Sequence, residues 1–158
     1  MLHAFSGFTC SVSQLQVESR GSVAIRSREP REAPAIRYNY LATENDRRVM
    51  VDGLKIVRRI VNTKPLSDYA SAEELPGPKV QSDEEWLAFV REYGETVFHP
   101  TSTCSIGPVL DHRLRVKGIG GLRVVDASVM PAVPSGNINA AVIAIAEKGA
   151  DIVKQDAQ

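Results

Sequence analysis

Apolar and polar residues alternate in two short stretches near the start of the chain. In GFTCSVSQLQV, residues 7–17, apolar and polar residues alternate with Phe8, Cys10 and Val12 on one face, which is typical of a half-buried β-strand. The alternation resumes in SVAIRS, residues 22–27, after a turn that contains Gly21. These two stretches are predicted to form an antiparallel pair. The proline-containing stretch that follows, residues 28–41, is predicted to be an extended surface loop.

Apolar residues recur at helical spacing in three later segments. Thr43, with Asp46 three residues on, begins a predicted helix over residues 43–62. Ser82 and Glu85 form a capping box before a short amphipathic segment. The last segment, INAAVIAIAEKGADIV, consists of small and β-branched residues, and its small side chains would permit close packing. The Pro-rich stretch between the first two helices is predicted to be a loop with one short turn.

A glycine-rich turn lies between two short apolar segments in LRVKGIGGLRVVDAS, residues 114–128. The piece KGIGG lacks both the GxGxxG spacing followed by a helix and the GxxxxGK[ST] pattern of phosphate-binding loops. It is therefore predicted to be a tight turn between strands. Val124 and Val125 make the second segment a predicted buried strand.

Length and composition narrow the class of protein. The 158 residues fit one ordinary domain, and 43% hydrophobic residues would allow it a core. Nineteen basic and nineteen acidic residues balance, so bulk charge does not select nucleic acid or an anionic membrane as a partner. Two cysteines are too few for a disulfide framework and favour a reducing compartment. The sequence shows neither a signal peptide nor a membrane span, which predicts a cytoplasmic chain.

Candidate chemistry centres on His99 and Asn137. His99 precedes Pro100 in a turn rich in Thr and Ser, and Asn137 lies in a second polar turn that opens the last helix. If the fold brings these turns together, the imidazole can accept a proton from an alcohol while the carboxamide donates to the same oxygen. The N-terminus of the last helix can also hold an electron-rich group, such as a phosphate or a reduced aromatic cofactor.

Other interpretations of these residues stay open at this point. His99 alone could be a structural histidine, and Asn137 could serve only as the N-cap of the last helix. A metal site made of His99, Cys104 and His112 lacks a fourth ligand, so no metal is predicted. A serine nucleophile is disfavoured because no GxSxG elbow is present.

Four segments resemble one protein family in order along the chain. HPTSTCSIGPVLDHRLRVKGIGGLRVVDAS and VMPAVPSGNINAAVIAIAEKGADIV are similar to the C-terminal region of the glucose-methanol-choline (GMC) flavoprotein oxidoreductases. SVSQLQVESRGSVAIRS and PAIRYNYLATENDRRVMVDGLKIVRRI resemble the sheet and helix that precede this region in the family. The resemblance covers nearly the whole chain and is strongest to choline dehydrogenase-like and other alcohol dehydrogenase-like members.

The resemblance implies an α+β fold. Residues 1–104 would form part of a substrate-binding domain, with an antiparallel sheet and flanking helices. Residues 105–158 would supply a C-terminal strand and helix that complete an FAD-binding domain whose N-terminal half, with its GxGxxG motif, is absent from this sequence. The missing half would normally cover the C-terminal segment. The chain is therefore expected to expose apolar side chains, centred on Val124, Val125, Ile143 and Ile145.

The resemblance also implies roles for individual residues. His99 matches the catalytic histidine of the family, which accepts the substrate hydroxyl proton while hydride passes to FAD, and Asn137 matches the position of its hydrogen-bonding partner. Asp126 and Ala127 fall where the family approaches the ribityl and pyrophosphate groups of FAD. Ile138 and Asn139 fall near the pyrimidine edge of the flavin. The implied partners are a small-molecule alcohol, an electron acceptor such as oxygen or a quinone, and the missing FAD-binding half.

The sequence departs from the family at three positions of this region. The family usually has Gly where Ser102 stands, commonly Met where Ile106 stands and often Pro where His112 stands. Two rival hypotheses accompany the oxidoreductase. One is a noncatalytic truncated domain that acts only with a partner chain, and the other is a hydroxynitrile-lyase-type enzyme on the same scaffold, which uses the histidine as a base without hydride transfer.

Overall fold

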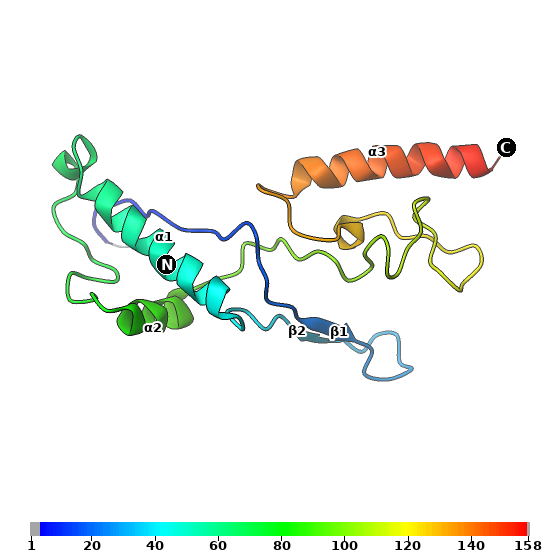
Figure 1. Cartoon of the computed structure of the whole chain (residues 1–158), viewed down its shortest axis with the longest axis horizontal. Helices are drawn as coiled ribbons and strands as arrows, with labels where there is room; N and C mark the ends of the chain where they lie inside the picture. The colour runs from blue at the N-terminus through cyan, green and yellow to red at the C-terminus, as the bar shows by residue number, and fades with distance from the viewer. Residues whose placement is uncertain (1–3, 158) are drawn as a thin grey trace. The chain divides into compact units, whose positions relative to one another are not determined.

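A computed structural model of the chain describes residues 4–157 (Figure 1). Residues 1–3 and 158 lie outside the described part. The first three residues of the N-terminal segment, in which no signal peptide is predicted, are therefore among those not described. The chain divides into two compact units. The first comprises Met1–Gln14 and Leu41–Glu95, and the second comprises Leu15–Tyr40 and Thr96–Gln158. No helix in the described part is both long enough and apolar enough to cross a membrane.

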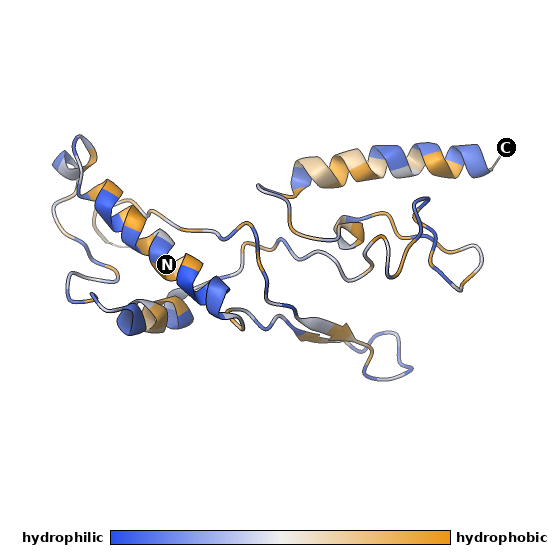
Figure 2. Ribbon diagram, viewed as in Figure 1, coloured by the Kyte–Doolittle hydropathy of each residue, from blue (hydrophilic) through white to orange (hydrophobic). Residues whose placement is uncertain are grey.

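The first unit is built on the helix α1, Glu44–Val61, which confirms the predicted helix over 43–62. Thr43 caps it, because the Thr43 side chain accepts a hydrogen bond of 3.1 Å from the Asp46 backbone amide. Acidic residues in the first turn and basic residues in the last turn suit the helix dipole. Figure 2 shows apolar and polar positions alternating along α1, as the helical spacing predicts.

The helix α2, Asp83–Tyr93, packs against α1. Its predicted capping box is confirmed, since Ser82 accepts from the Glu85 backbone amide and Glu85 accepts from the Ser82 amide at 2.9 Å. Hydrogen bonds from the backbone amides of Gln81 and Ser82 lower the pKa of the Glu85 carboxyl. Trp86 is the most buried residue of α2, at 2% exposure.

Arg58, near the end of α1, binds the loop that connects α1 and α2. Its guanidinium lies 4.1 Å from the centre of the Trp86 ring and donates to the Glu73 carboxylate at 2.6 Å. It also donates to the carbonyl oxygens of Gly77 and Val80. The predicted loop with one short turn is confirmed, the turn being the 3₁₀ helix η1, Leu66–Asp68.

The predicted strand pair is wrong in its choice of partners. The strand β1, Ser22–Ala24, pairs in antiparallel register with β2, Ala35–Arg37, which lies in the stretch predicted to be a loop. Residues 7–17 form no strand. Instead the part of this stretch in the first unit contacts α1: the Val12 side chain fills the space beside Gly53, and Gln14 donates to the Asp46 carboxylate at 2.6 Å. Alternation therefore reflects packing on a helix here.

The core of the second unit lies where the 104–129 segment packs on the helix α3, Asn139–Asp156. Leu110, Leu114 and Val129 are buried, and partly buried apolar residues surround them: Cys104, Val109, Val116, Val124, Val125 and Ile145. The small residues of α3 do permit close packing, because a Cβ atom at Gly149 would lie 2.4 Å from Val125 Cγ1.

The predicted strand at Val124 and Val125 is wrong within the described residues. In the 114–124 segment, Arg115 forms an isolated bridge with Arg123, with single hydrogen bonds on either side, and Val116 forms another isolated bridge with Leu110. A strand needs a neighbour along its length, and two isolated bridges to different segments do not supply one. The tight turn between the two segments is confirmed, and Gly118 and Gly121 adopt positive φ angles of 81° and 73° in it.

The expected apolar exposure is present in part. Ile143 is 55% exposed, and Val124, Val125 and Ile145 are half-buried against the core of the second unit. None of the four side chains is fully buried. The first half of α3 therefore carries uncovered apolar surface (Figure 2).

Candidate functional site

His99 lies in a turn whose backbone is constrained on both sides. Phe98 before it and Ser102 after it have positive φ angles of 58° and 76°. The His99 side chain is half-buried, and the hydroxyl oxygens of Thr101 and Ser102 are 3.0 Å apart. The turn thus holds an accessible imidazole on a short polar loop.

The φ angle at Ser102 explains the glycine that is usual in the family at this position. A left-handed backbone costs a residue with a side chain about 1–2 kcal/mol, whereas glycine adopts it freely. Replacing Ser102 by Gly is therefore expected to stabilise the second unit by about 0.5–1 kcal/mol, after allowance for the greater freedom of glycine in the unfolded chain. Urea unfolding of the two proteins measures this difference, and an unchanged or lower stability would contradict it.

Two backbone hydrogen bonds fix the exit of the His99 turn. The amide of Cys104 donates to the carbonyl of Ser128 at 3.0 Å, and the amide of Ile106 donates to the carbonyl of Val129 at 3.0 Å. The turn is thereby tied to the 3₁₀ helix η2, Ala127–Val129. The structure therefore brings the segment of Asp126 and Ala127 beside the segment that leaves His99.

Asp126 caps η2 with its own side chain. Its Oδ1 atom accepts from the Ser128 amide at 2.8 Å and from the Ser128 hydroxyl at 2.5 Å. Asp126 is exposed and Ala127 is half-buried. One carboxylate oxygen is thus occupied locally, and the second has no protein partner among the residues that the structure describes.

Asn137 is not the N-cap of the last helix, so that interpretation is wrong. Ile138 occupies the N-cap position in a helical conformation, and its side chain makes no capping hydrogen bond. A capping side chain would accept a hydrogen bond from one of the first amides of the helix, and no such bond from α3 to Asn137 is present among the described residues. Ile138 is buried, while Asn137 and Asn139 are exposed. The Asn137 carboxamide makes no hydrogen bond within residues 4–157.

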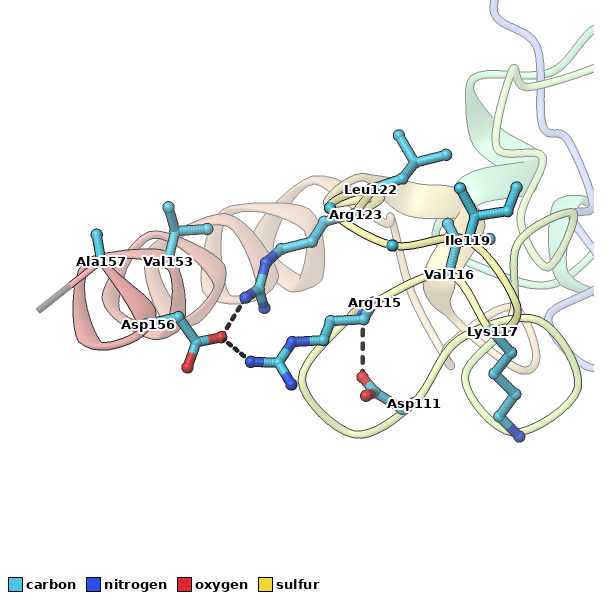
Figure 3. Close-up of a pocket in the computed structure, with 12 residues that line it drawn as sticks. Asp111, Arg115, Val116, Lys117, Ile119, Leu122, Arg123, Val153, Asp156 and Ala157 are labelled. Atoms are coloured by element: carbon cyan, nitrogen blue, oxygen red, sulfur yellow. Dashed lines mark hydrogen bonds and ion pairs between the residues drawn. The ribbon is translucent and has the colours of Figure 1, made fainter.

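No hydrogen bond joins the His99 and Asn137 side chains within residues 4–157, and their pairing stays a prediction. His99, Cys104 and His112 form no metal-binding cluster in the described part of the chain. A hollow of about 430 Å³ in the second unit lies elsewhere, at the C-terminal end of α3 (Figure 3). We regard that hollow as separate from the predicted alcohol site, because neither His99 nor Asn137 lines it.

Sequence reasoning missed a group of charged residues at this hollow. The carboxylate of Asp156 receives hydrogen bonds from three guanidiniums, those of Arg113 and Arg115 at 2.5 Å and that of Arg123. Figure 3 shows the bonds from Arg115 and Arg123. The spacing R-x-R at 113–115 was the available signal, since alternate residues of an extended segment share a face. Arg113 first, then Arg123 and Arg115, hold the pKa of the Asp156 carboxyl far below its ordinary value.

This pKa shift makes the stability of the second unit pH-dependent. Because the folded-state pKa of Asp156 is lowered, its contribution is fully present above the unfolded pKa of about 4 and is lost as the pH falls below it. We expect Asp156→Asn to lower the free energy of unfolding at pH 7, with the difference from the natural chain shrinking toward pH 3. Urea titrations at both pH values measure it, and a difference that grows on acidification would contradict the assignment.

Comparison with known proteins assigns the sequence to a family. The sequence model for the C-terminal domain of GMC oxidoreductases matches residues 17–146. The oxygen-dependent choline dehydrogenase of Serratia proteamaculans is 46% identical over 153 residues, covering 94% of this chain and 28% of that protein. The same enzyme of Citrobacter koseri is 46% identical over 152 residues, covering 94% of this chain and 27% of that protein. The chain therefore spans little more than a quarter of the length of these relatives.

Solved structures share the fold. Pyridoxine 4-oxidase from Mesorbium loti superposes with a TM-score of 0.81 at 38% identity, covering 87% of this chain and 28% of that structure. A formate oxidase from Aspergillus oryzae superposes with a TM-score of 0.82 at 32% identity, covering 89% of this chain and 25% of that structure. The α+β class, with a small antiparallel sheet and helices, is thus confirmed, and the formate oxidase is a protein that carries FAD.

Proposed function

Because the chain belongs to the GMC oxidoreductase family, we propose that it is the C-terminal catalytic region of a flavoprotein that oxidises a primary or secondary alcohol to the carbonyl compound. His99 accepts the hydroxyl proton as the hydride leaves the alcohol carbon. Asn137 donates a hydrogen bond to the substrate oxygen, where negative charge builds as the proton leaves.

The observation that supports this proposal best is the state of the Asn137 turn. The Asn137 carboxamide makes no hydrogen bond within the described residues and is exposed, so its N–H donors are available to another oxygen. The half-buried His99 is held in a turn tied to η2 by two backbone hydrogen bonds. A base and a donor on anchored turns are what proton removal from an alcohol requires.

The residues at the N-terminus of α3 fit FAD. No side chain at the Ile138 N-cap position satisfies the first amides of α3, so these amides and the helix dipole favour an electron-rich group. We assign Ile138 and Asn139 to the pyrimidine edge of the flavin, and Asp126 and Ala127 to its ribityl and pyrophosphate portion. Bound FAD would supply the hydride acceptor.

The proposal requires further partners. Residues 1–104 are assigned to a substrate-binding domain and residues 105–158 to the FAD-binding domain, whose N-terminal half is supplied by additional polypeptide. The matched length of the relatives supports this, since the chain corresponds to 28% of the Serratia enzyme. The electron acceptor is oxygen or a quinone-like carrier, and the substrate is a choline-like or other small alcohol.

A chimera tests the proposal. The region of the Serratia proteamaculans relative that precedes its match to this chain is joined to residues 4–157, and the product is purified with FAD. Anaerobic addition of choline or an aryl alcohol is expected to bleach the flavin absorption near 450 nm and to yield the aldehyde. The intact relative serves as the positive control, and the relative's preceding region alone serves as the negative control.

The outcomes separate the rival functions. A chimera that binds FAD but is not reduced by any alcohol, while the intact relative is reduced, would remove the oxidoreductase assignment. Cleavage of a hydroxynitrile without flavin reduction would identify the lyase instead. A chimera that folds without binding FAD would identify the noncatalytic domain.

A further inference from the structure

The carboxylate of Asp156 carries more hydrogen bonds than one of its oxygens can accept. Oδ2 alone receives Nε of Arg113 at 3.3 Å, Nη2 of Arg115 at 2.5 Å and Nη2 of Arg123. A carboxylate oxygen offers two lone pairs. At least one of these guanidiniums is therefore attracted to Asp156 by electrostatics more than by a well-directed hydrogen bond. The side chain of that arginine can rotate to bind a second anion.

Arg115 is the guanidinium best placed to turn. Arg113 is bound to both carboxylate oxygens, and Arg123 also donates to the Arg113 carbonyl at 2.6 Å. Arg115 makes one side-chain bond, its Nε and Nη1 have no protein partner among the residues described, and its side chain is 48% exposed. It thus keeps the N–H donors of two nitrogens for a ligand.

The charges around the hollow are not balanced. Arg115, Lys117 and Arg123 line it against Asp111 and Asp156, and Arg113 adds a further positive charge at the same carboxylate. The Asp111 carboxylate is turned to the backbone amides of Arg113 and Arg115 at 2.8 and 2.9 Å. Lys117 donates to the Gly107 carbonyl. The group therefore carries a surplus of two positive charges.

Apolar side chains form the other wall of the same hollow. Ile119, Leu122 and Val153 line it and are 56%, 46% and 45% exposed. Figure 3 shows Ile119 and Leu122 on the side of the hollow opposite the carboxylate of Asp156. At about 430 Å³ the hollow has the size of a small-ligand site.

We propose that this hollow binds a small organic anion, a carboxylate or phosphate monoester that carries an apolar or aromatic body. Arg115 and Arg123 hold the oxyanion, and Ile119 and Leu122 contact the body. This site is separate from His99 and Asn137, and its occupancy does not require a flavin.

Phenyl phosphate tests both parts of this site, because its phosphate would bind the arginines and its ring would contact the apolar side chains. By isothermal titration to the purified chain, phenyl phosphate is expected to bind about 10-fold more tightly than inorganic phosphate, with phenol showing no binding. Arg115→Gln is expected to weaken phenyl phosphate about 10-fold or more. Lys148→Gln, which removes an equal charge from an exposed position of α3, is expected to leave the affinity within twofold.

Asp156→Asn tests whether the arginines bind a ligand or only stabilise α3 through Asp156. Removal of the competing carboxylate is expected to tighten phenyl phosphate several-fold and to let the ligand raise the lowered Tm of the variant. The proposal would be overturned if phenyl phosphate bound the natural chain and Arg115→Gln with equal affinity, or if it showed no saturable binding. It would also be overturned if Lys148→Gln lost as much affinity as Arg115→Gln. If Asp156→Asn does not fold, the comparison of Arg115→Gln with Lys148→Gln decides alone.

Discussion

Replacing His99 by Gln in the chimera with the Serratia relative is expected to lower the rate of alcohol oxidation by roughly 10²- to 10⁴-fold. Glutamine retains the size and a hydrogen-bonding end but cannot take up a proton near neutral pH. The loss should appear in kcat and in the rate of anaerobic flavin reduction, because in the proposed mechanism His99 accepts the hydroxyl proton as the hydride leaves. The FAD content should be unchanged, since His99 is not assigned to hold the cofactor.

His112 provides the matched control for this variant. It is exposed in the second unit and lies outside the proposed alcohol site, so His112→Gln is expected to keep the activity of the natural chain. An active His99→Gln chimera would remove the base assignment while leaving the family membership intact. A loss of bound FAD in His99→Gln would show that the residue supports the fold or the cofactor instead.

Replacing Gly149 by Ala is expected to destabilise the second unit by about 2 kcal/mol, although alanine is the better helix former by about 1 kcal/mol. The new Cβ would lie 2.4 Å from Val125 Cγ1 and 3.4 Å from Leu114 Cδ1. Leu114 is buried in the core, so the contact is relieved only by displacing packed side chains. Urea unfolding of the chain measures the effect.

Gly149→Ala is expected to stabilise the second unit, and not to destabilise it, once the Val125 side chain is shortened. In a Val125→Ala background the space beside Gly149 is open, and Gly149→Ala should then raise stability through helix propensity. A destabilisation of the same size in both backgrounds would show that Val125 is not the contact that excludes a side chain at position 149.

The helices could be predicted because their signals are local. Thr43 and Ser82 mark helix starts through bonds to residues three positions away, and the structure has both bonds. Strand partners could not be predicted, because alternation shows which face is covered but not what covers it. The 7–17 stretch illustrates this, since its Val12 packs against Gly53 of α1 and not against a strand.

The candidate site was predictable to a similar extent. A motif can place His99 and Asn137 in two turns, and the anchoring of the first turn to η2 follows from backbone pairing that no single-residue pattern reveals. The cluster around Asp156 could not be foreseen, because it joins Arg113 and Arg123 to a residue more than thirty positions away. Such pairings depend on how α3 lies on the preceding segment.

The helix α3 is held at two points: three arginines bind Asp156 at its C-terminal end, and Gly149 packs closely against Val125 near its middle. With about 1.5 Å of rise per residue, Asp156 lies about 10 Å beyond Gly149, and Asn139 lies about 25 Å from Asp156. If the clamped end stays fixed, lifting the helix by about 1 Å at Gly149 swings its first turn by more than about 2 Å. A methyl group added at Gly149 would thus move the neighbouring Asn137 amide by more than its proposed hydrogen bond to the substrate oxygen tolerates.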